Sequence, residues 1–349
     1  MASSAPIRVV IVDDSLVARE MLSQILATDS SIEVVGQAAD GQEGVDMVAR
    51  LRPDLVTMDI HMPRMDGLEA TERIMAFTPT PILVVSSSVH GEGMGLAFDA
   101  LSAGALEVIK KPEPRDWAEL ERIGHDVIRK VKILARVKVI THIRGRRTVP
   151  ARRDRHAVTP VPEGRSIVAI GSSTGGPSAL MSVLKPLPSD FTLPIVIAQH
   201  IAEGFIPGLV SWLNEACAIS VRAATDGGTL ERGVAYFAPT GMNLTVDGTR
   251  LMFSMPEKGQ LYIPSADTLF ASVARTHRAR GIGVLLTGMG ADGAVGLKAM
   301  HDSGAATIAQ DEETSTVFGM PRAAIELHAA SVVLAVQDVA AEMLRLAGL

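Results

Sequence analysis

The sequence lacks the features that would place a chain outside the cytoplasm or in a membrane. It has one cysteine, Cys217, among 349 residues, so an internal disulfide is excluded, and a buried structural thiol at the end of an amphipathic helix is expected. The first apolar run, Ile7–Val12, is short and stops at two aspartates, so no signal peptide is expected. No run approaches the length needed to cross a bilayer. A soluble, cytoplasmic protein is predicted.

Excess positive charge is lacking as well. The chain carries 33 basic and 39 acidic residues, a formal net charge of −6, which argues against nucleic acid as its principal partner. Its 47% of hydrophobic residues can fill a sizeable core, and its length predicts about two domains. Only Arg144–Arg165 is dense in arginine and proline, without aromatic residues. We interpret it as a flexible linker, with contact to nucleic acid, anionic lipid or an acidic partner as open alternatives.

One stretch, IVAIGSSTGGPSAL at Ile167–Leu180, has the pattern of a strand, a tight turn and a helix. The apolar run Ile167–Ile170 breaks at small polar residues, and Pro177 opens the helical segment. The turn fits the G-x-S-x-G nucleophile elbow, with Ser173 as the presented hydroxyl. The same pattern fits a glycine-rich loop that binds phosphate or only closes the helix onto the strand. A catalytic serine therefore requires a base elsewhere in the chain.

Acidic residues follow two predicted strands in the first half of the chain. Ile7–Val12 ends at Asp13 and Asp14, and Leu55–Met58 ends at Asp59. Strand Glu33–Ala38 and helices Leu16–Leu26 and Gln42–Leu51 lie between them. Because the carboxyl ends of parallel strands converge, the three carboxylates should meet there, and they favour Mg²⁺.

Two further polar residues follow later strands and should reach the same edge of the sheet. Ser86 follows strand Ile82–Val85, and Lys111 follows strand Glu107–Ile109. A hydroxyl and an ammonium are suitable partners for a phosphoryl group on Asp59.

Asp13-Asp14, MDIHMPRMDG around Asp59, Ser86 and Lys111-Pro112 occur in an order that resembles the receiver domain of two-component response regulators. The resemblance covers roughly Ile7 to Leu120 and implies a flavodoxin-like fold with a five-stranded parallel sheet. It implies that Asp59 takes a phosphoryl group from a histidine kinase, that Asp13, Asp14 and Asp59 hold Mg²⁺, and that Ser86 and Lys111 read the phosphate. Val108 stands where many receivers carry a switch aromatic, so a different internal relay is expected.

The second half of the chain again places chemistry at strand ends. Strand Ile195–Gln199 ends at His200, and strand Ile282–Leu286 leads to the turn that contains Asp292. A serine needs a base, and the imidazole needs a carboxylate that orients it. Taken singly, His200 also fits a strand-end residue bonded to backbone and Asp292 a helix cap; together with Ser173 they favour hydrolysis. The chain order Ser, His, Asp differs from that of α/β-hydrolases.

The intervening segments predict a β-rich middle and a helix. The expected elements are strands Ser220–Arg222, Gly233–Phe237, Leu244–Val246 and Leu251–Ser254, a hairpin turn at Asp247-Gly248 and a helix over Ala266–His277. A C-terminal doubly wound, mostly parallel α/β domain is predicted.

GSSTGG, AQHIAEGF, PSADTLF, LTGMGADGA, TIAQDE and FGMPRAAIE, in this order, resemble the catalytic domain of chemotaxis protein-glutamate methylesterases, the CheB family. The resemblance implies hydrolysis of γ-glutamyl methyl esters on methyl-accepting chemoreceptors, with release of methanol, and deamidation of receptor glutamines. It implies Ser173 as nucleophile, His200 as general acid and base, and Asp292 as its orienting partner. It also implies phosphorylation by a chemotaxis histidine kinase and membrane contact only through receptors.

Other expectations concern the site and its surroundings. No cofactor is expected in the esterase site, and the backbone N–H groups near Thr174 and Met289 are the oxyanion-hole candidates. Tyr262-Ile263-Pro264-Ser265 stands where this family usually has H-R-P-S, which leaves the receptor set open. A non-enzymatic output that binds a phosphorylated ligand is the closest rival, and a DNA-binding output is disfavoured because the segment is long and not basic.

The domain organisation follows from these assignments. The receiver is expected over residues 1–122, a helical connector and basic linker over 123–165, and the catalytic domain over 166–349. The amphipathic pattern from Trp117 to about Ile140 is interpreted as the closing receiver helix running into the connector. The face around Met94–Ile109 is expected to dock over the Ser173 cleft and inhibit it until Asp59 is phosphorylated.

Overall fold

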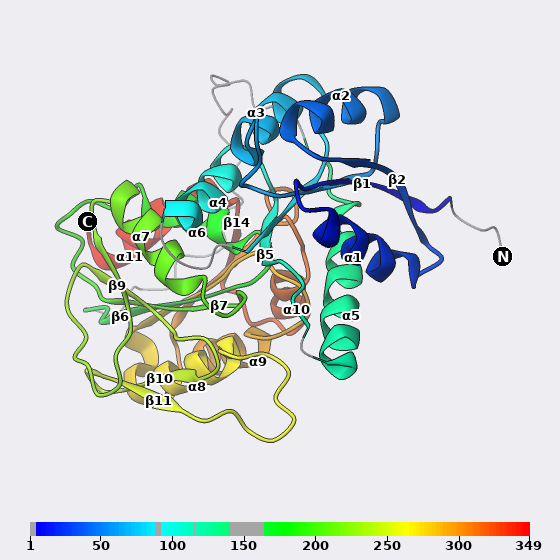
Figure 1. Cartoon of the computed structure of the whole chain (residues 1–349). Helices are drawn as coiled ribbons and strands as arrows, with labels where there is room; N and C mark the ends of the chain where they lie inside the picture. The colour runs from blue at the N-terminus through cyan, green and yellow to red at the C-terminus, as the bar shows by residue number, and fades with distance from the viewer. Residues whose placement is uncertain (1–4, 88–91, 115, 140–163) are drawn as a thin grey trace. The chain divides into compact units, whose positions relative to one another are not determined.

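The computed structural model describes residues 5–87, 92–114, 116–139 and 164–349. The chain divides into two compact units, residues 1–142 and 143–349 (Figure 1). The predicted linker, Arg144–Arg165, lies almost wholly outside the described residues.

The first unit is built on a five-stranded parallel sheet with the order β2-β1-β3-β4-β5. Its strands are β1 (Ile7–Val12), β2 (Ile32–Ala38), β3 (Leu55–Met58), β4 (Ile82–Ser86) and β5 (Glu107–Lys110). Its helices are α1 (Leu16–Ala27), α2 (Gly41–Leu51), α3 (Gly67–Phe77), α4 (Glu92–Ser102) and α5 (Trp117–Leu134). The predicted flavodoxin-like order is confirmed.

Aspartate side chains begin three of these helices. Asp40, Asp66 and Asp116 each accept a hydrogen bond from the backbone N–H three residues later. Such caps satisfy N–H groups that have no partner within the helix, and their negative charge is stabilising at the positive, N-terminal end of the helix dipole. The strand-end aspartates Asp13 and Asp59 cap none of these three helices.

Helix α5 belongs to the first unit along its whole length. Val127, Val131 and Leu134 pack in the same core as residues of β1 and α1, and Lys132 pairs with Asp29 at 2.8 Å. The helix ends at Leu134, so the prediction of a helix to about Ile140 is wrong. The boundaries expected for the connector and linker, residues 123 and 165, stay predictions. The amphipathic pattern persists past the last helical residue because Val137 still packs on this core.

The second unit contains a seven-stranded sheet with the order β14-β13-β12-β6-β7-β9-β8, in which every pair is parallel. Its strands are β6 (Ile167–Ser172), β7 (Ile195–Gln199), β8 (Ser220–Ala223), β9 (Val234–Phe237), β12 (Gly281–Leu285), β13 (Ala306–Gln310) and β14 (Val332–Leu334). Its α-helices are α6 (Gly176–Leu184), α7 (Ile206–Ala216), α8 (Ala266–His277), α9 (Ala294–Asp302), α10 (Met320–Glu326) and α11 (Val336–Ala347). The predicted fold class is confirmed.

The β-rich middle divides between two sheets. Strands β8 and β9 extend the main sheet, whereas β10 (Asn243–Asp247) and β11 (Arg250–Ser254) form a separate antiparallel hairpin. Asp247 pairs with Arg250 across the turn, as the Asp247-Gly248 signal predicted. Strand β6 runs two residues further than predicted, because Gly171 and Ser172 are paired within the sheet.

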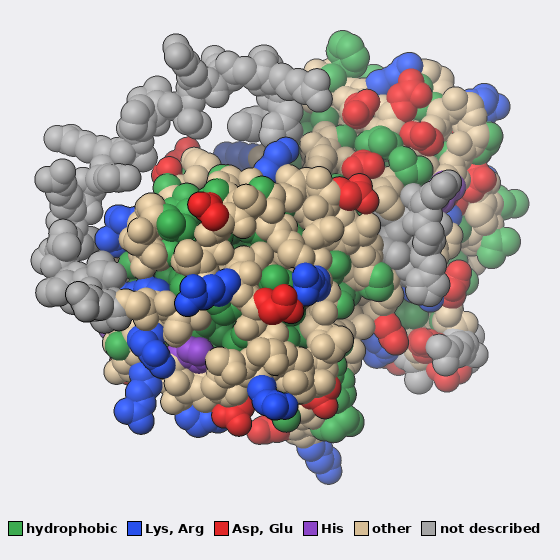
Figure 2. Space-filling view, turned by 90° about the vertical axis from the view of Figure 1, so that its left-hand side faces the viewer, with side chains coloured by type: hydrophobic (Ala, Val, Ile, Leu, Met, Phe, Trp, Pro, Cys, Tyr) green, Lys and Arg blue, Asp and Glu red, His purple; other side chains and the backbone are tan. Residues whose placement is uncertain are grey.

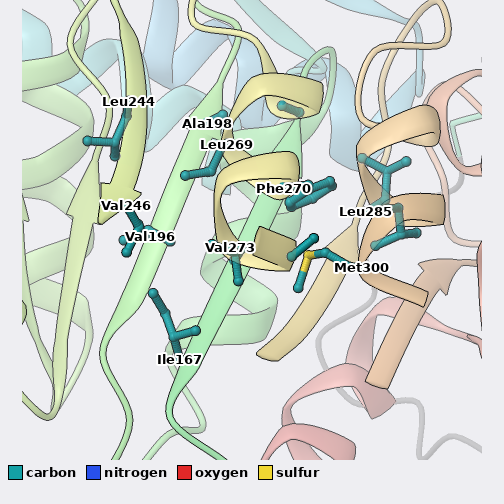
Figure 3. Close-up of a cluster of buried hydrophobic side chains, with 14 of the residues drawn as sticks. Ile167, Val196, Ala198, Leu244, Val246, Leu269, Phe270, Val273, Leu285 and Met300 are labelled. Atoms are coloured by element: carbon teal, nitrogen blue, oxygen red, sulfur yellow. The ribbon is translucent and has the colours of Figure 1, made fainter. Parts of the chain in front are cut away.

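Apolar side chains from the main sheet, the hairpin and the helices fill the main core of the second unit. Helices α8 and α9 and the hairpin cover one face of the sheet, and α6, α7 and α11 lie on the other (Figure 1). Figure 3 shows Ile167 and Val196 of the sheet facing Leu269, Phe270 and Val273 of α8. This packing holds the strands whose ends carry the predicted site.

Three features discussed from the sequence can be compared with the structure: the cysteine, the lack of a membrane span and the distribution of surface charge. Cys217 ends α7 and is half-buried, and burial raises its pKa to about 11, so it is a neutral thiol at physiological pH. Among the described residues no helix combines the length and apolarity that a membrane span requires. On the face shown in Figure 2, acidic and basic side chains are interspersed.

Candidate active site and phosphoacceptor site

The three residues predicted for hydrolysis lie at one edge of the large sheet. Strand β6 lies between β7 and β12, and Ser172 is in register with Gln199. Ser173 directly follows β6 and His200 directly follows β7, and the His200 N–H donates to the Ser172 carbonyl at 3.0 Å. On the other side, the Ser173 N–H donates to the Thr287 carbonyl at 3.0 Å. Neighbouring parallel strands therefore bring the serine and the histidine together.

A buried glutamine joins the two turns that follow β6 and β7. Gln199 Nε2 donates to the carbonyl oxygens of Ser173 at 2.9 Å and His200 at 2.8 Å, and its Oε1 accepts from Ser172 Oγ at 2.6 Å. A Cβ on Gly176 would lie 2.0 Å from this Oε1, which explains the glycine that directly follows the G-x-S-x-G motif. The role of Gln199 was not predicted, although a polar residue within a buried strand is a usable signal.

The imidazole of His200 is held by a buried carboxylate. His200 Nε2 lies 2.9 Å from Asp292 Oδ2. The same carboxylate accepts from Ser265 Oγ at 2.8 Å and from the N–H groups of Ala266 at 2.7 Å and Asp267 at 3.2 Å. Burial alone would raise the pKa of Asp292, but these hydrogen bonds and the His200 pairing outweigh it and hold the pKa below its usual value. Asp292 is therefore an ionised acceptor at the N-terminus of α8.

The partner of Nε2 determines which nitrogen of His200 is free. An ionised carboxylate only accepts hydrogen bonds, so a neutral imidazole bonded to Asp292 carries its proton on Nε2. Nδ1 then holds the lone pair, and it is buried without a hydrogen-bond partner in the described part of the chain. A buried acceptor of this kind costs free energy unless a donor satisfies it. Nδ1 is thus the ring nitrogen that remains open to a hydrogen-bond donor.

The predicted oxyanion donors lie on two turns: Thr174 on the turn after β6 and Met289 on the turn after β12. Within the described residues, the backbone N–H groups of Thr174 and Met289 donate no hydrogen bond, whereas that of Ser173 is already used by Thr287. A Cβ on Gly288 would lie 2.7 Å from Ser173 Cβ, so the glycine allows the two turns to approach. The oxyanion assignment stays a prediction.

The Tyr262 segment lies directly beside the site. The Tyr262 ring stacks on that of His200, with centroids 5.0 Å apart and an interplanar angle of 8°. Ser265 is the N-cap residue of α8, and its hydroxyl both caps that helix and donates a hydrogen bond to Asp292. Neither contact was predicted; a serine followed by an acidic residue at a helix start is the signal for the second.

The strand-end carboxylates of the first unit also meet. Ligand atoms of Asp13, Asp14 and Asp59 lie within 4.8 Å of one another, and Lys111 Nζ is 2.8 Å from Oδ2 of both Asp13 and Asp59. Burial raises the pKa of Asp59; the hydrogen bond and charge of Lys111 oppose this shift, and Asp13 adds to it. Burial lowers the pKa of Lys111, but the two carboxylates outweigh it and raise that pKa.

This donor set fits Mg²⁺. Two buried carboxylates and the exposed Asp14 supply three hard oxygen ligands, fewer than octahedral Mg²⁺ takes, which leaves positions for water and for phosphate oxygens. A divalent cation would also offset the like-charge repulsion that one lysine relieves only in part.

The predicted phosphate readers lie at the same sheet edge. Buried Ser86 ends β4, and its carbonyl accepts the Lys111 N–H at 3.0 Å. Val108 is buried in β5, in register with Val84. The position that carries an aromatic in many receivers is therefore filled here by an aliphatic core residue.

A receiver-type sheet followed by a parallel α/β domain defines a response regulator with a hydrolase-like output domain. The CheB methylesterase family matches residues 168–343, and the response regulator receiver domain family matches residues 9–120. The chain belongs to the CheB methylesterase family.

Individual relatives agree with this membership. A protein-glutamate methylesterase/protein-glutamine glutaminase of Syntrophus aciditrophicus is 45% identical over 98% of this chain and 99% of its own. One from Geobacter metallireducens is 46% identical over 93% of this chain and 94% of its own. The solved CheB methylesterase catalytic domain of Thermotoga maritima is 34% identical, covers 53% of this chain and 99% of that chain, and has a TM-score of 0.50.

Proposed function

We propose that the chain hydrolyses glutamate γ-methyl esters on methyl-accepting chemoreceptors, releases methanol, and deamidates receptor glutamines at the same site, under the control of phosphorylation, in chemotaxis adaptation. Family membership supports the reaction class. The single observation that carries the residue assignment is the pairing of His200 Nε2 with Asp292, which leaves Nδ1 unpartnered on a residue that follows β7 as Ser173 follows the neighbouring β6.

The first half of the reaction transfers the acyl group to the enzyme. Ser173 Oγ attacks the ester carbonyl carbon while His200 Nδ1 takes the hydroxyl proton. The imidazolium is stabilised by ionised Asp292, and the N–H groups of Thr174 and Met289 receive the oxyanion. The imidazolium then returns its proton to the departing methoxide, and methanol leaves.

The second half restores the enzyme. Water attacks the acyl-serine and gives one proton to Nδ1. When the tetrahedral intermediate collapses, the imidazolium returns that proton to the departing Ser173 Oγ, and the glutamic acid product loses its own proton to solvent and leaves as a carboxylate. An amide substrate follows the same route with ammonia as the leaving group. No step needs a cofactor in this site.

Methanol release distinguishes this proposal from its closest rival. Purified full-length protein mixed with receptor carrying radiolabelled methyl esters should release labelled methanol, and glutamine-bearing receptor should release ammonia. A non-enzymatic output domain that binds a phosphorylated ligand would release neither.

In the receiver, Asp59 is the proposed phosphoacceptor for a chemotaxis histidine kinase. Asp13, Asp14 and Asp59 would hold Mg²⁺, which supplies charge neutralisation for the incoming phosphoryl group. Lys111 and Ser86 would contact the phosphate once it is attached. The pairing of Lys111 with Asp59 and Asp13 supports this assignment.

Replacing Asp59 with Asn should abolish phosphorylation by a kinase or by acetyl phosphate, because the acceptor oxygen is lost. Asp14→Ala should instead weaken Mg²⁺ binding and slow the reaction while leaving the acceptor present. Labelling with radioactive phosphodonor measures both. Normal labelling of Asp59→Asn would refute the assignment, and its esterase activity should stay at the basal level.

The receiver is proposed to inhibit the esterase until it is phosphorylated. A domain tethered to its target has a high effective concentration there, so weak docking can keep the Ser173 cleft covered. Added charge beside Ser86 and Lys111 would remodel the face around 94–109 and remove this preference. A closed form favoured roughly 10- to 100-fold needs only about 1.4 to 2.7 kcal/mol of coupling.

Deleting residues 1 to about 150 should therefore raise basal esterase activity by a factor on the order of 10 to 100 and make it insensitive to phosphodonor. The measurement compares the full-length and truncated proteins on one methylated receptor, with and without acetyl phosphate. A truncated protein no faster than the unphosphorylated whole would instead indicate a receiver that activates by contact or by recruitment.

A further inference from the structure

We propose that Tyr262 is a positioning residue whose ring holds the His200 imidazole in place and stabilises the imidazolium that forms during each proton transfer. The inference rests on the proposed function of His200. It concerns the position at which this chain departs from the usual family segment, and it assigns that tyrosine a role in the reaction itself.

The geometry is that of a parallel, offset ring stack. Centroids 5.0 Å apart and planes only 8° from parallel place the aromatic face of Tyr262 against the face of the imidazole. Asp292 occupies the ring edge at Nε2, so the stack leaves the opposite edge, at Nδ1, for the serine proton. The carboxylate fixes one ring atom, and the stack restricts rotation of the ring plane.

The tyrosine is held by a built segment. Buried Asn243, at the start of β10, accepts from the Ser265 N–H at 2.9 Å and exchanges side-chain hydrogen bonds of 2.9 and 3.2 Å with Gln260. One asparagine therefore fixes the chain on both sides of Tyr262. At the hydroxyl end of the ring, a Cβ at Gly290 would lie 2.4 Å from the tyrosine hydroxyl oxygen, so the phenol also abuts the turn after β12.

The charge of the imidazole changes during the reaction, and the stack responds to that change. The face of an aromatic ring is electron-rich and attracts a cation more than it attracts a neutral ring. Because the imidazolium forms only as the serine proton is transferred, this attraction is stronger in the transition state than in the resting enzyme. Tyr262 should therefore raise kcat.

The other groups around the imidazole are accounted for. Three titratable residues in the described part of the chain contact His200 or its carboxylate partner. Asp292, before α9, pairs with His200, and Tyr262 stacks on it. Asp267, in the first turn of α8, donates its backbone N–H to Asp292. Asp292 and Asp267 are unchanged by substitutions at Tyr262. A comparison of Phe and Leu at this position therefore isolates the ring.

The experiment measures kcat/KM for methanol release against pH in Tyr262→Phe and Tyr262→Leu. Phe keeps the ring and should stay within about twofold of wild type, whereas Leu should lose roughly 3- to 30-fold, equivalent to about 0.6 to 2 kcal/mol at about 1.36 kcal/mol per tenfold. Since neutral imidazole is the active base, loss of imidazolium stabilisation should move the acidic limb of the Leu profile to lower pH. A merely structural role would lower the plateau without moving that limb.

Controls keep the outcome decisive. Leu261→Ala removes the exposed neighbouring side chain and should change neither plateau nor limb. If Tyr262→Leu does not fold, the ring-current shift of the His200 carbon-bound protons in wild-type and Tyr262→Phe NMR spectra tests the stack directly. An unmoved limb in Tyr262→Leu, equal losses in Phe and Leu, or no upfield shift would overturn the proposal. A wild-type protein that releases no methanol would refute the proposed function, whereas the NMR readout would still judge the stack.

Discussion

Ser173→Ala should reduce methyl-ester hydrolysis by on the order of 10⁴-fold or more, because the substitution removes the only atom that forms the acyl-enzyme. Ser173 is half-buried in the turn after β6, and its side chain makes no hydrogen bond in the described part of the chain. Stability and phosphorylation of Asp59 should therefore stay unchanged. Methanol release, thermal melting and phosphate labelling of one protein preparation measure all three.

The adjacent serine provides the matched control. Ser172 is fully buried and donates to Gln199 Oε1, so it cannot reach a substrate. Ser172→Ala leaves a buried acceptor unpaired, which should cost about 1 to 3 kcal/mol of stability while most activity per folded molecule remains. Equal loss of activity in the two variants would show that the nucleophile has been assigned to the wrong serine.

His200→Ala should be about as damaging as Ser173→Ala, and the double variant should be hardly worse than either single one. Residues that act as one unit are not additive, because removing either partner already disables the proton transfer. The measurement is kcat for the two single variants and the double variant on the same receptor. Multiplicative losses would mean that Ser173 and His200 act independently.

Asp292→Asn extends this test to the third residue. An amide can still bond the imidazole, but it lacks the charge that stabilises imidazolium, and it can leave the proton on the wrong nitrogen. The loss should be roughly 10- to 100-fold milder than that of either partner. A variant with full activity would assign Asp292 a purely structural role at the start of α8.

Some parts of the fold were readable from local pattern. Runs such as Ile195–Gln199 are continuously apolar because both faces of a parallel strand are covered, and the residues after them were placed correctly at one sheet edge. Chain order of Asp13, Asp59 and Lys111 sufficed for the carboxylate and lysine cluster, because parallel strands deliver their ends to the same side.

Other parts were not readable because they depend on contacts between distant segments. The end of α5 was placed too late, since Val137 continues the amphipathic pattern beyond the helix. The hairpin of β10 and β11 could not be separated from β8 and β9 by strand propensity, because pairing partners decide sheet membership. The bonds of Gln199 to two turns likewise require the register of β6 and β7.

The sequence by itself determined the fold class, the family and the residue types at the ends of the strands, because periodicity, glycine turns and motif order are local properties of the chain. Only the tertiary structure decided which nitrogen of His200 is free, that Ser265 and helix α8 hold Asp292 ionised, and that Tyr262 stacks on the imidazole. These features join residues 27 to 92 positions apart, and hydrogen bonds and ring contacts over such separations exist only once the strands have paired and the core has packed.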